Sequence, residues 1–294
     1  MKVLVTGASG FLGRALVTEL LAHGHMVSTL HRGAPLEGVP EHTAADVLAP
    51  AALEAVRGVE GVVHLAGRGD VVDSFKRPEF YHQLNAVGTL AMLGAAREQG
   101  AAFVLASSQR VYRPREGLLS EDDLATPSTP YGYSKLIAET WVQSYARLHG
   151  VRGVVVRIFS AYGPAQTSLG ASNVVTIFMR RALHQEPLIV TGTQRQDFVA
   201  VEDAVSGLRL ALERGAAGER YNLATGIGTS VLELAHIARD ALGSHSTIEQ
   251  RDAPAHDGDL VANIDKARGE LGYDPRVTLA EGLRRYAERL RLDG

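Results

Sequence analysis

The chain contains no cysteine, which excludes disulfide bonds and cysteine-based metal sites. A membrane-spanning helix needs about 18 uninterrupted apolar residues, and no stretch of the chain approaches that length. The N-terminal segment MKVLVTGASG contains no apolar core of a signal peptide. Lysine and arginine form no stripe or cluster, and the formal net charge is -3. We therefore expect a soluble, cytoplasmic protein that binds neither membranes nor nucleic acids. The 11 histidines form no H-E-x-x-H pattern, and no metal site is predicted.

The first half of the chain alternates short apolar strands with helical segments. Strands are predicted at residues 2–7, 26–31, 61–67, 101–108 and 153–159, and helices at 11–24, 48–58, 80–100 and 131–150. The strands are apolar almost throughout, as expected for a parallel sheet that is covered on both faces. This rhythm predicts an α/β fold with a Rossmann-type doubly wound parallel sheet.

The alternation changes after residue 162, where helices are predicted at 172–185 and 203–215. A strand at 220–225 could return to the main sheet. We therefore expect a dinucleotide-binding domain and a smaller, mixed substrate-binding domain. The first comprises 1–162, with 197–224 returning to it, and the second comprises 163–196 and 225–294.

A glycine-rich turn joins the first predicted strand to the first predicted helix. Gly7, Gly10 and Gly13 are spaced G-x-x-G-x-x-G within VLVTGASGFLGRAL. The first two glycines let backbone N–H groups approach a pyrophosphate at the helix N-terminus, and the third lets the helix pack closely on the strand. Glycine-rich turns are common, but a strand before this one and a helix after it predict a dinucleotide site.

The end of the second predicted strand, STLHRG, bears on which dinucleotide binds. An acidic residue there would bind the ribose 2′-OH of NAD, but this chain has His31 followed by Arg32. Arg32 could pair with a 2′-phosphate and so favours NADP; the alternative is a solvated arginine beside bound NAD. The other assignments by position are Asp46 and Val47 beside the adenine, and Ala66 and Gly67 beneath the cofactor.

The segment PYGYSK places a tyrosine and a lysine at the start of a predicted helix. Tyr131 and Lys135 are four residues apart and therefore face the same way. The lysine ammonium, with the positive charge of an oxidised nicotinamide, would lower the tyrosine pKa from about 10. Tyr131 could then exchange a proton with a substrate oxygen that Ser108, at a strand end, hydrogen-bonds. Y-x-x-x-K alone would indicate an exposed helix pair; the glycine turn and the strand-end serine favour catalysis.

These elements together resemble the extended short-chain dehydrogenase/reductase family, in particular the NAD-dependent epimerase/dehydratase group that acts on nucleotide sugars. The resemblance spans nearly the whole chain and is carried by TGASGFLG, HLAG, NAVGTLAML, SSQRVY, PYGYSK, RIFSAYGP, QDFVAVEDAV, YNLATG and LGYDP. It implies a Rossmann domain, a smaller substrate domain and a homodimer formed through two long helices per subunit, here 80–100 and 131–150.

The resemblance also implies roles for individual residues. Ser108, Tyr131 and Lys135 match the catalytic triad, and Asn85 matches a helix asparagine near the active site that could instead cap or bend its helix. The expected cofactor site comprises Gly7, Ser9, Gly10, Phe11, Leu12, Gly13, His31, Arg32, Asp46, Val47, Leu65, Ala66, Gly67, Asn85, Ala106, Tyr131, Lys135 and Ile158. The expected substrate site comprises Ser74, Gln109, Ser160, Asn173, Arg195 and His256.

Departures from the family pattern narrow the expected chemistry. Gln109 and Arg110 stand where dehydratases of this group carry an Asp-Glu pair, and the glutamate of the related decarboxylases is absent. Sugar dehydration is therefore disfavoured. What remains is hydride chemistry at C4, either epimerisation or reduction of a 4-keto sugar.

Three further departures concern residues that usually grip the nucleotide diphosphate. Ser160, Gln196 and His256 replace an asparagine and two arginines. Arg195 could take over one contact, and Asn173 could donate to a phosphate. Because a charge-assisted contact is stronger than a neutral one, a smaller carbonyl substrate or an unusual sugar stays open.

The predicted activity is hydride transfer at C4 of a nucleotide-linked sugar with NADP or NAD. We favour a 4-ketoreductase of a dTDP-4-keto-6-deoxy sugar, because NADP suits a reductase better than an epimerase, which recycles its own cofactor. One alternative is a nucleotide-sugar 4-epimerase of the UDP-hexose type. Another is a non-catalytic dinucleotide-binding sensor, but such proteins tend to lose the tyrosine or the lysine, and this chain keeps both.

Overall fold

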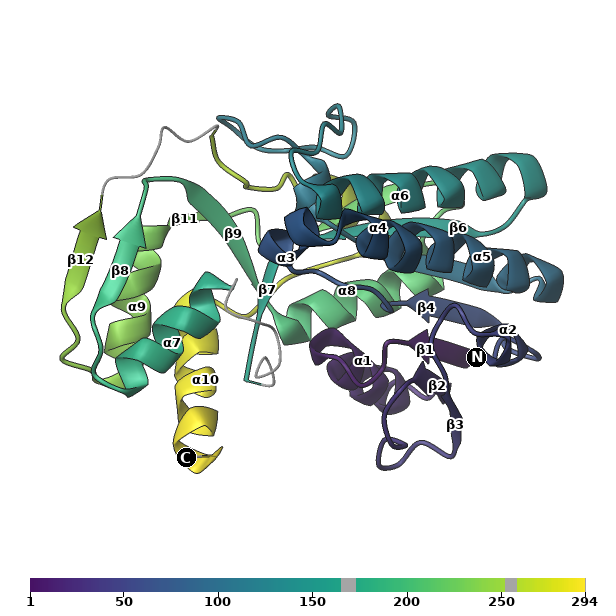
Figure 1. Ribbon diagram of the computed structural model, residues 1–294, viewed down its shortest axis with the longest axis horizontal. Helices are drawn as coiled ribbons and strands as arrows, with labels where there is room; N and C mark the ends of the chain where they lie inside the picture. The colour runs from purple at the N-terminus through teal and green to yellow at the C-terminus, as the bar shows by residue number, and fades with distance from the viewer. Residues whose placement is uncertain (165–172, 252–257, 294) are drawn as a thin grey trace.

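The computed structural model describes residues 1–164, 173–251 and 258–293 and has a larger and a smaller region (Figure 1). The larger region is built on seven parallel strands in the order β10-β6-β5-β4-β1-β2-β3. These strands are β1 (Lys2–Thr6), β2 (Met26–His31), β3 (Glu41–Ala44), β4 (Gly61–His64), β5 (Ala102–Ser108), β6 (Gly153–Ile158) and β10 (Arg220–Leu223). The predicted doubly wound sheet is confirmed, and the strand predicted at 220–225 joins it beside β6.

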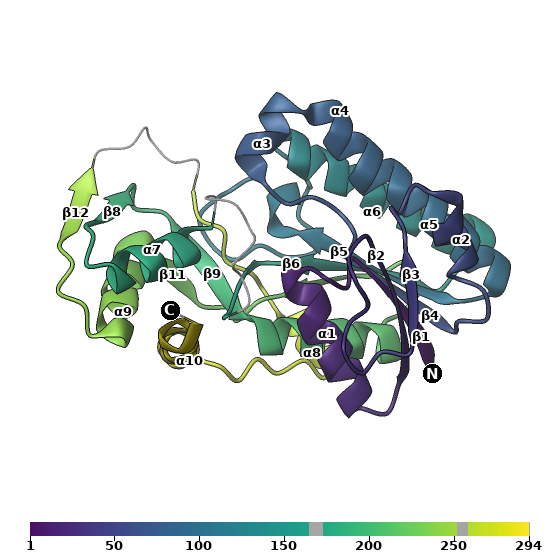
Figure 2. The ribbon, with the colours of Figure 1, turned by 60° about the horizontal axis from the view of Figure 1, so that its bottom comes forward.

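Helices cover both faces of this sheet (Figure 2). One face packs against α1 (Phe11–Ala22) and α8 (Val201–Arg214), and the other against α2 (Pro50–Glu54), α5 (Gly88–Gln99) and α6 (Pro130–His149). Successive strand residues point to opposite faces, so Val3 and Val5 lie in one core and Leu4 in the other. Burying each such side chain stabilises the fold by about 1.5–3 kcal/mol, which explains the nearly continuous apolar strands.

The helix that carries Tyr131 has defined ends. The Thr129 hydroxyl accepts a hydrogen bond from the Gly132 N–H at 3.0 Å, and Pro130 occupies the first helical position. The helix ends at Gly150, which adopts the left-handed conformation. These caps fix the segment PYGYSK as the first turn of α6.

The predicted helix 80–100 is interrupted in the structure. It consists of α4 (Pro78–Tyr81), a π-helical turn η1 (His82–Val87) and α5. The Asn85 carbonyl in η1 accepts a hydrogen bond from the Thr89 hydroxyl at 2.6 Å. π-helical turns are frequent at functional sites, and this one presents the Asn85 side chain to the loop that follows β4.

The smaller region contains the sheets β11-β9-β7 and β12-β8. Its elements are β7 (Ser160–Tyr162), α7 (Val174–Leu183), β8 (Leu188–Thr191), β9 (Arg195–Ala200), β11 (Gly228–Ser230), α9 (Val231–Leu242), β12 (Ile248–Arg251) and α10 (Leu279–Asp293). Phe178, Leu234 and Tyr286 belong to its core. The division of the chain into a dinucleotide domain and a substrate domain stays a prediction.

Short connecting elements complete the fold. They are α3 (Val71–Lys76), η2 (Gln109–Val111) and η3 (Ala267–Leu271). The strands β3, β7 and β9 were not predicted, because they are short and mix polar with apolar residues; β3 reads EHTA and has no buried position. Within the three described ranges, no helix is both long enough and apolar enough to cross a membrane.

Candidate active site

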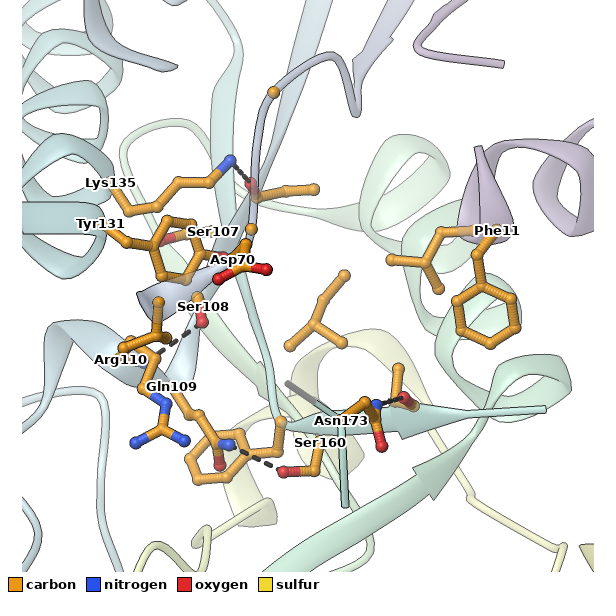
Figure 3. Close-up of a pocket in the computed structure, with 18 of the residues that line it drawn as sticks. Phe11, Asp70, Ser107, Ser108, Gln109, Arg110, Tyr131, Lys135, Ser160 and Asn173 are labelled. Atoms are coloured by element: carbon orange, nitrogen blue, oxygen red, sulfur yellow. Dashed lines mark hydrogen bonds between the residues drawn. The ribbon is translucent and has the colours of Figure 1, made fainter. Parts of the chain in front are cut away.

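A cavity of about 560 Å³ lies at the carboxyl ends of the central strands (Figure 3). Gly7 follows β1, Leu65 follows β4, Ser108 ends β5 and Ile158 ends β6, and all four line the cavity. The opposite wall is formed by Ser160, Ala161, Asn173, Val174, Gln196 and Phe198. Open α/β sheets bind ligands in this position.

The glycine turn opens onto one end of the cavity. Gly7 has a φ of +68°, and a Cβ at this position would lie 2.8 Å from the Ala66 nitrogen. A Cβ at Gly13 would lie 2.4 Å from the Gly7 carbonyl oxygen, so the turn and α1 can approach only through glycine. Gly10 is the N-cap of α1 and provides no side-chain cap, which leaves the first N–H groups of the helix to a ligand. This cradle fits the pyrophosphate of a dinucleotide.

Asn85 joins segments behind the cavity rather than lining it. Its side-chain oxygen accepts a hydrogen bond from the Arg68 N–H at 2.8 Å, and its amide nitrogen donates to the Ser134 hydroxyl at 2.9 Å. Ser134 in turn donates to the Tyr131 carbonyl at 2.7 Å. Asn85 therefore holds the loop after β4 against the first turn of α6.

The Lys135 ammonium group is buried and donates a hydrogen bond to the Ala106 carbonyl at 2.8 Å (Figure 3). Burial lowers the pKa of Lys135 to about 8, and the negative charge of Glu139 opposes this shift. Lys135 and Tyr131 both line the cavity from α6. The structure thus places the predicted triad of Ser108, Tyr131 and Lys135 together, and the catalytic roles stay predictions.

The pKa of Tyr131 is shifted in the direction opposite to the sequence-based expectation. Burial raises this pKa, while a hydrogen bond with the Ser108 hydroxyl and the positive charge of Arg110 oppose the shift without reversing it. Lys135 is not among the causes of the shift in the protein alone, and the expected lowering by Lys135 together with an oxidised nicotinamide stays a prediction. The cation that acts on the phenol belongs to η2, not to α6.

This reversal gives a testable expectation for the cofactor-stripped protein. Tyr131 should not ionise below about pH 10, the ordinary tyrosine value, because burial disfavours the phenolate. A phenolate absorbance titration of the wild type minus that of Tyr131→Phe measures this ionisation, and added NAD⁺ should move it to lower pH. Ionisation of Tyr131 near neutral pH in the stripped protein would contradict the expectation.

Polar side chains form a chain across the floor of the cavity. The Gln109 amide donates to the Ser160 hydroxyl at 2.8 Å, and Ser160 donates to the Gln196 side-chain oxygen at 3.0 Å. The chain connects η2 of the larger region with β7 and β9 of the smaller one. Asn173 caps α7, since its side-chain oxygen accepts from the Val175 N–H at 2.9 Å. The predicted substrate residues Gln109, Ser160 and Asn173 thus all line the cavity.

Several predicted site residues do not line the cavity. They are Ser9, His31, Arg32, Asp46, Val47, Ala66, Ser74, Asn85 and Arg195. The Ser74 hydroxyl is buried and donates to the Val71 carbonyl at 2.6 Å, and the Arg195 guanidinium donates to the Gly228 carbonyl at 3.1 Å. The Ser74 hydroxyl and the exposed Arg195 guanidinium are thus both bonded to backbone carbonyls. His256 lies outside the described residues.

At the end of β2, His31 occupies the position where an acidic residue would bind the ribose 2′-OH of NAD. The His31 ring packs on His42 with centroids 4.2 Å apart, and its Nδ1 accepts from the Gly33 N–H at 3.2 Å. Burial lowers the pKa of His31, and the nearby His42 and Arg14 add to this shift. Arg32 is exposed beside it. In the described parts of the chain, no three His, Asp or Glu side chains converge as a metal site.

The loop after β4 was predicted as part of the site only as far as Gly67. Arg68, Gly69 and Asp70 line the cavity, and the Asp70 carboxylate caps α3 by accepting from the Asp73 N–H at 2.9 Å. The available signal was the glycine pair in HLAGRGD, directly after a predicted strand. Arg110 was noted only as a departure from the family pattern, yet it also lines the cavity.

The fold and the cavity define an enzyme of the extended short-chain dehydrogenase/reductase type. The profile of the NAD dependent epimerase/dehydratase family matches residues 3–224, and the chain belongs to this family. It is 33% identical over 308 residues to a UDP-glucose 4-epimerase of Mycolicibacterium smegmatis, covering 98% of both chains. It is 32% identical to UDP-glucuronic acid decarboxylase 2 of Arabidopsis thaliana, covering 96% of this chain and 66% of that protein.

A solved structure shows the same architecture with ligands. This chain superposes on UDP-glucuronic acid 4-epimerase from Bacillus cereus in complex with UDP-glucuronic acid and NAD, with a TM-score of 0.91 and 27% identity over 100% of both chains. The expected family and fold are therefore confirmed.

Proposed function

We propose that the protein is an NAD-dependent 4-epimerase of a UDP-linked sugar. The observation that carries the proposal is the composition of one cavity wall. Ser108, Tyr131 and Lys135 stand ready for proton exchange, while the two positions after Ser108 are a glutamine and an arginine. The similarity to UDP-sugar 4-epimerases supports this choice over the 4-ketoreductase that the sequence favoured.

The same wall argues against elimination and decarboxylation. Removal of water from a sugar needs a proton donor and a proton acceptor beside the triad. Gln109 is only 5% exposed and its amide is bonded to Ser160, while the Arg110 guanidinium does not release its proton in this pH range. Neither side chain replaces the acidic pair of the dehydratases or the glutamate of the decarboxylases.

We also propose NAD rather than NADP as the cofactor. The structure from Bacillus cereus holds NAD. Arg32 is exposed, and within the described ranges its side chain makes no hydrogen bond or ion pair that would hold it toward a 2′-phosphate. Arg32 is therefore read as a solvated arginine, which was the alternative at the outset. A 4-ketoreductase using NADPH takes second place.

The chain's own groups would divide the work of epimerisation as follows. When bound, the nicotinamide supplies the hydride acceptor and donor at C4 and the positive charge that favours the Tyr131 phenolate. Tyr131 takes the proton from the sugar O4 and later returns it. Ser108, which lines the cavity with Tyr131, would hold the reacting oxygen in place by a hydrogen bond. Lys135, fixed on the Ala106 carbonyl, keeps a positive charge in the wall below its pKa of about 8.

Incubation of the purified protein with UDP-sugars tests the proposal. An epimerase forms the C4 epimer without net consumption of cofactor. A reductase instead consumes NADPH when given a dTDP-4-keto-6-deoxy sugar. Identification of any cofactor that co-purifies with the protein is a second test, since retained NAD supports the epimerase. Turnover only with NADPH and a keto sugar would replace our proposal by the reductase.

We further propose that the protein forms a homodimer through α6 and the adjoining α3 and α4, which lie side by side (Figures 1 and 2). Exposed apolar side chains gather there, namely Val72, Phe75, Phe80, Ile137 and Trp141. Ile137 and Trp141 are four residues apart on α6 and face the same way. A patch of this kind commonly marks a protein interface.

The double substitution Ile137→Glu with Trp141→Glu should convert the dimer to a monomer, because two charges would enter an apolar contact. Light scattering coupled to size-exclusion chromatography measures the mass. Leu124→Glu is the matched control, since Leu124 is 82% exposed on a loop and should leave the dimer intact. A monomeric wild type, or a dimer that survives the double substitution, would refute the proposed interface.

A further inference from the structure

Arg110 is a cation in the cavity wall that has no anionic partner among the described residues. Its side chain is partly buried and lies with Ser108 and Gln109 on the Tyr131 side of the cavity (Figure 3). The Arg110 backbone N–H donates to the Ser108 hydroxyl at 3.2 Å, but within the described residues its guanidinium forms no hydrogen bond or ion pair. Burial lowers the pKa of Arg110, which reflects the cost of holding this charge away from water.

Two other arginines of the described residues whose side chains are largely removed from water each have a carboxylate partner. Arg157 is fully buried and bonds the Glu139 carboxylate at 2.7 Å, and Arg209 bonds Glu19 at 2.8 Å. A charge that is removed from water without a partner is strongly unfavourable. An anionic group of a bound ligand would therefore be stabilised beside Arg110, because it would supply the counter-charge that the guanidinium lacks among the described residues.

The position of Arg110 restricts which anion that is. A Cβ at Gly132 would lie 2.3 Å from the Arg110 carbonyl oxygen, so the Arg110 backbone packs on the first turn of α6. The Arg110 charge acts on the Tyr131 phenol, the group proposed to exchange a proton with O4. Phe11, the first residue of α1, lies across the cavity from Arg110 (Figure 3), so the cradle for the cofactor pyrophosphate at the start of α1 is on the far side. The anion thus belongs near the reacting sugar carbon.

Resting on the proposed 4-epimerase function, we infer that the substrate is a UDP-linked hexuronic acid whose C6 carboxylate pairs with Arg110. C6 is bonded to C5, which adjoins the reacting C4, so the carboxylate lies close to the oxygen that Tyr131 serves. A guanidinium presents two parallel N–H donors that match the two oxygens of a carboxylate. The hydroxymethyl group of a neutral hexose would leave the charge unpaired. Pairing also holds the carboxylate against loss as CO₂.

Calorimetric titration of the NAD-loaded protein with UDP-glucuronic acid, UDP-glucose and UDP tests the inference. The wild type should bind UDP-glucuronic acid at least about 10-fold more tightly than UDP-glucose. Arg110→Gln should weaken UDP-glucuronic acid about 10–100-fold, as expected for the loss of a charge-assisted pair, and change UDP-glucose less than about 3-fold. Arg110→Lys should recover part of the preference. Arg113→Gln, an exposed arginine outside the cavity lining, is the matched control.

Other outcomes overturn the inference or isolate it from the proposed function. If Arg110→Gln lost the same affinity for both sugars, the role of Arg110 would be structural. If the variant shifted the pH–rate profile but kept the sugar preference, Arg110 would act only on the Tyr131 phenolate. Thermal unfolding checks the fold, which should persist because the variant loses an unpaired charge. Epimerisation of UDP-glucose without preference for UDP-glucuronic acid would sink the inference alone. Failure to epimerise either sugar would sink the proposed function, while the binding ratio still decides the role of Arg110.

Discussion

Tyr131→Phe is expected to lower kcat by about 10²–10⁴-fold, the usual contribution of a positioned acid–base group. The substitution removes only the phenol hydroxyl, which Ser108 hydrogen-bonds and which the Arg110 charge favours as phenolate. The ring stays, so its edge-on packing against Tyr81, with centroids 6.3 Å apart, is retained. Cofactor and UDP-sugar affinities should therefore change little.

Steady-state kinetics and cofactor titration measure the two effects separately. Tyr133→Phe is the matched control, because Tyr133 lies on the same helix turn, is 54% exposed and does not line the cavity. It should retain nearly full activity. Activity of Tyr131→Phe within tenfold of the wild type would remove the phenol from the mechanism.

Glu139→Ala is expected to lower the free energy of unfolding by about 3–5 kcal/mol, because it leaves Arg157 buried without its counter-charge. The two side chains are 1% and 0% exposed, and two of the guanidinium nitrogens bond the carboxylate, at distances down to 2.7 Å. Glu139 also accepts a hydrogen bond from the Ser107 hydroxyl at 2.5 Å. Arg157 stacks over the Tyr112 ring, 4.6 Å from its centroid.

Urea unfolding of the wild type and the variant measures this loss. Glu54→Ala is the matched control, since Glu54, the last residue of α2, forms an exposed pair with Arg57 and exposed pairs contribute little. Glu139 lies on α6 one turn beyond Lys135, so the network also supports the wall of the active site. A loss for Glu139→Ala no larger than that for Glu54→Ala would show that the buried pair is not needed.

The apolar strands made the central sheet predictable, because both of its faces are buried and each strand reads as a hydrophobic run. Because we looked for apolar runs, we did not predict β3, whose residues are mostly polar and which pairs with β2 at the edge of the sheet. The sequence pattern also predicted one continuous helix at 80–100, whereas the structure has the π-helical turn η1 within it. That turn accompanies the bonds from Asn85 to Arg68 and Ser134, which are distant in sequence.

The site divides in a similar way. The spacing of Tyr131 and Lys135, and the serine at a strand end, follow from local geometry and were predictable. The pKa direction of Tyr131 was not, because it depends on burial by segments far apart in the chain. Arg195 looked suited to a diphosphate, but β11 offers it the Gly228 carbonyl instead. Only the folded chain shows that Arg110 stands in the cavity wall and that no carboxylate of the described residues pairs with it.

The most direct test of the central claim follows a deuterium label at C4 of UDP-glucuronic acid and of UDP-glucose. The purified protein is incubated with each in unlabelled water, without added reductant, and the sugars are analysed by NMR. We expect the C4 epimer to form with the deuterium still on C4 and with no net change in NAD or NADH. An epimer that has exchanged its label with water, or no epimer from either sugar, would contradict hydride-based C4 epimerisation at this site.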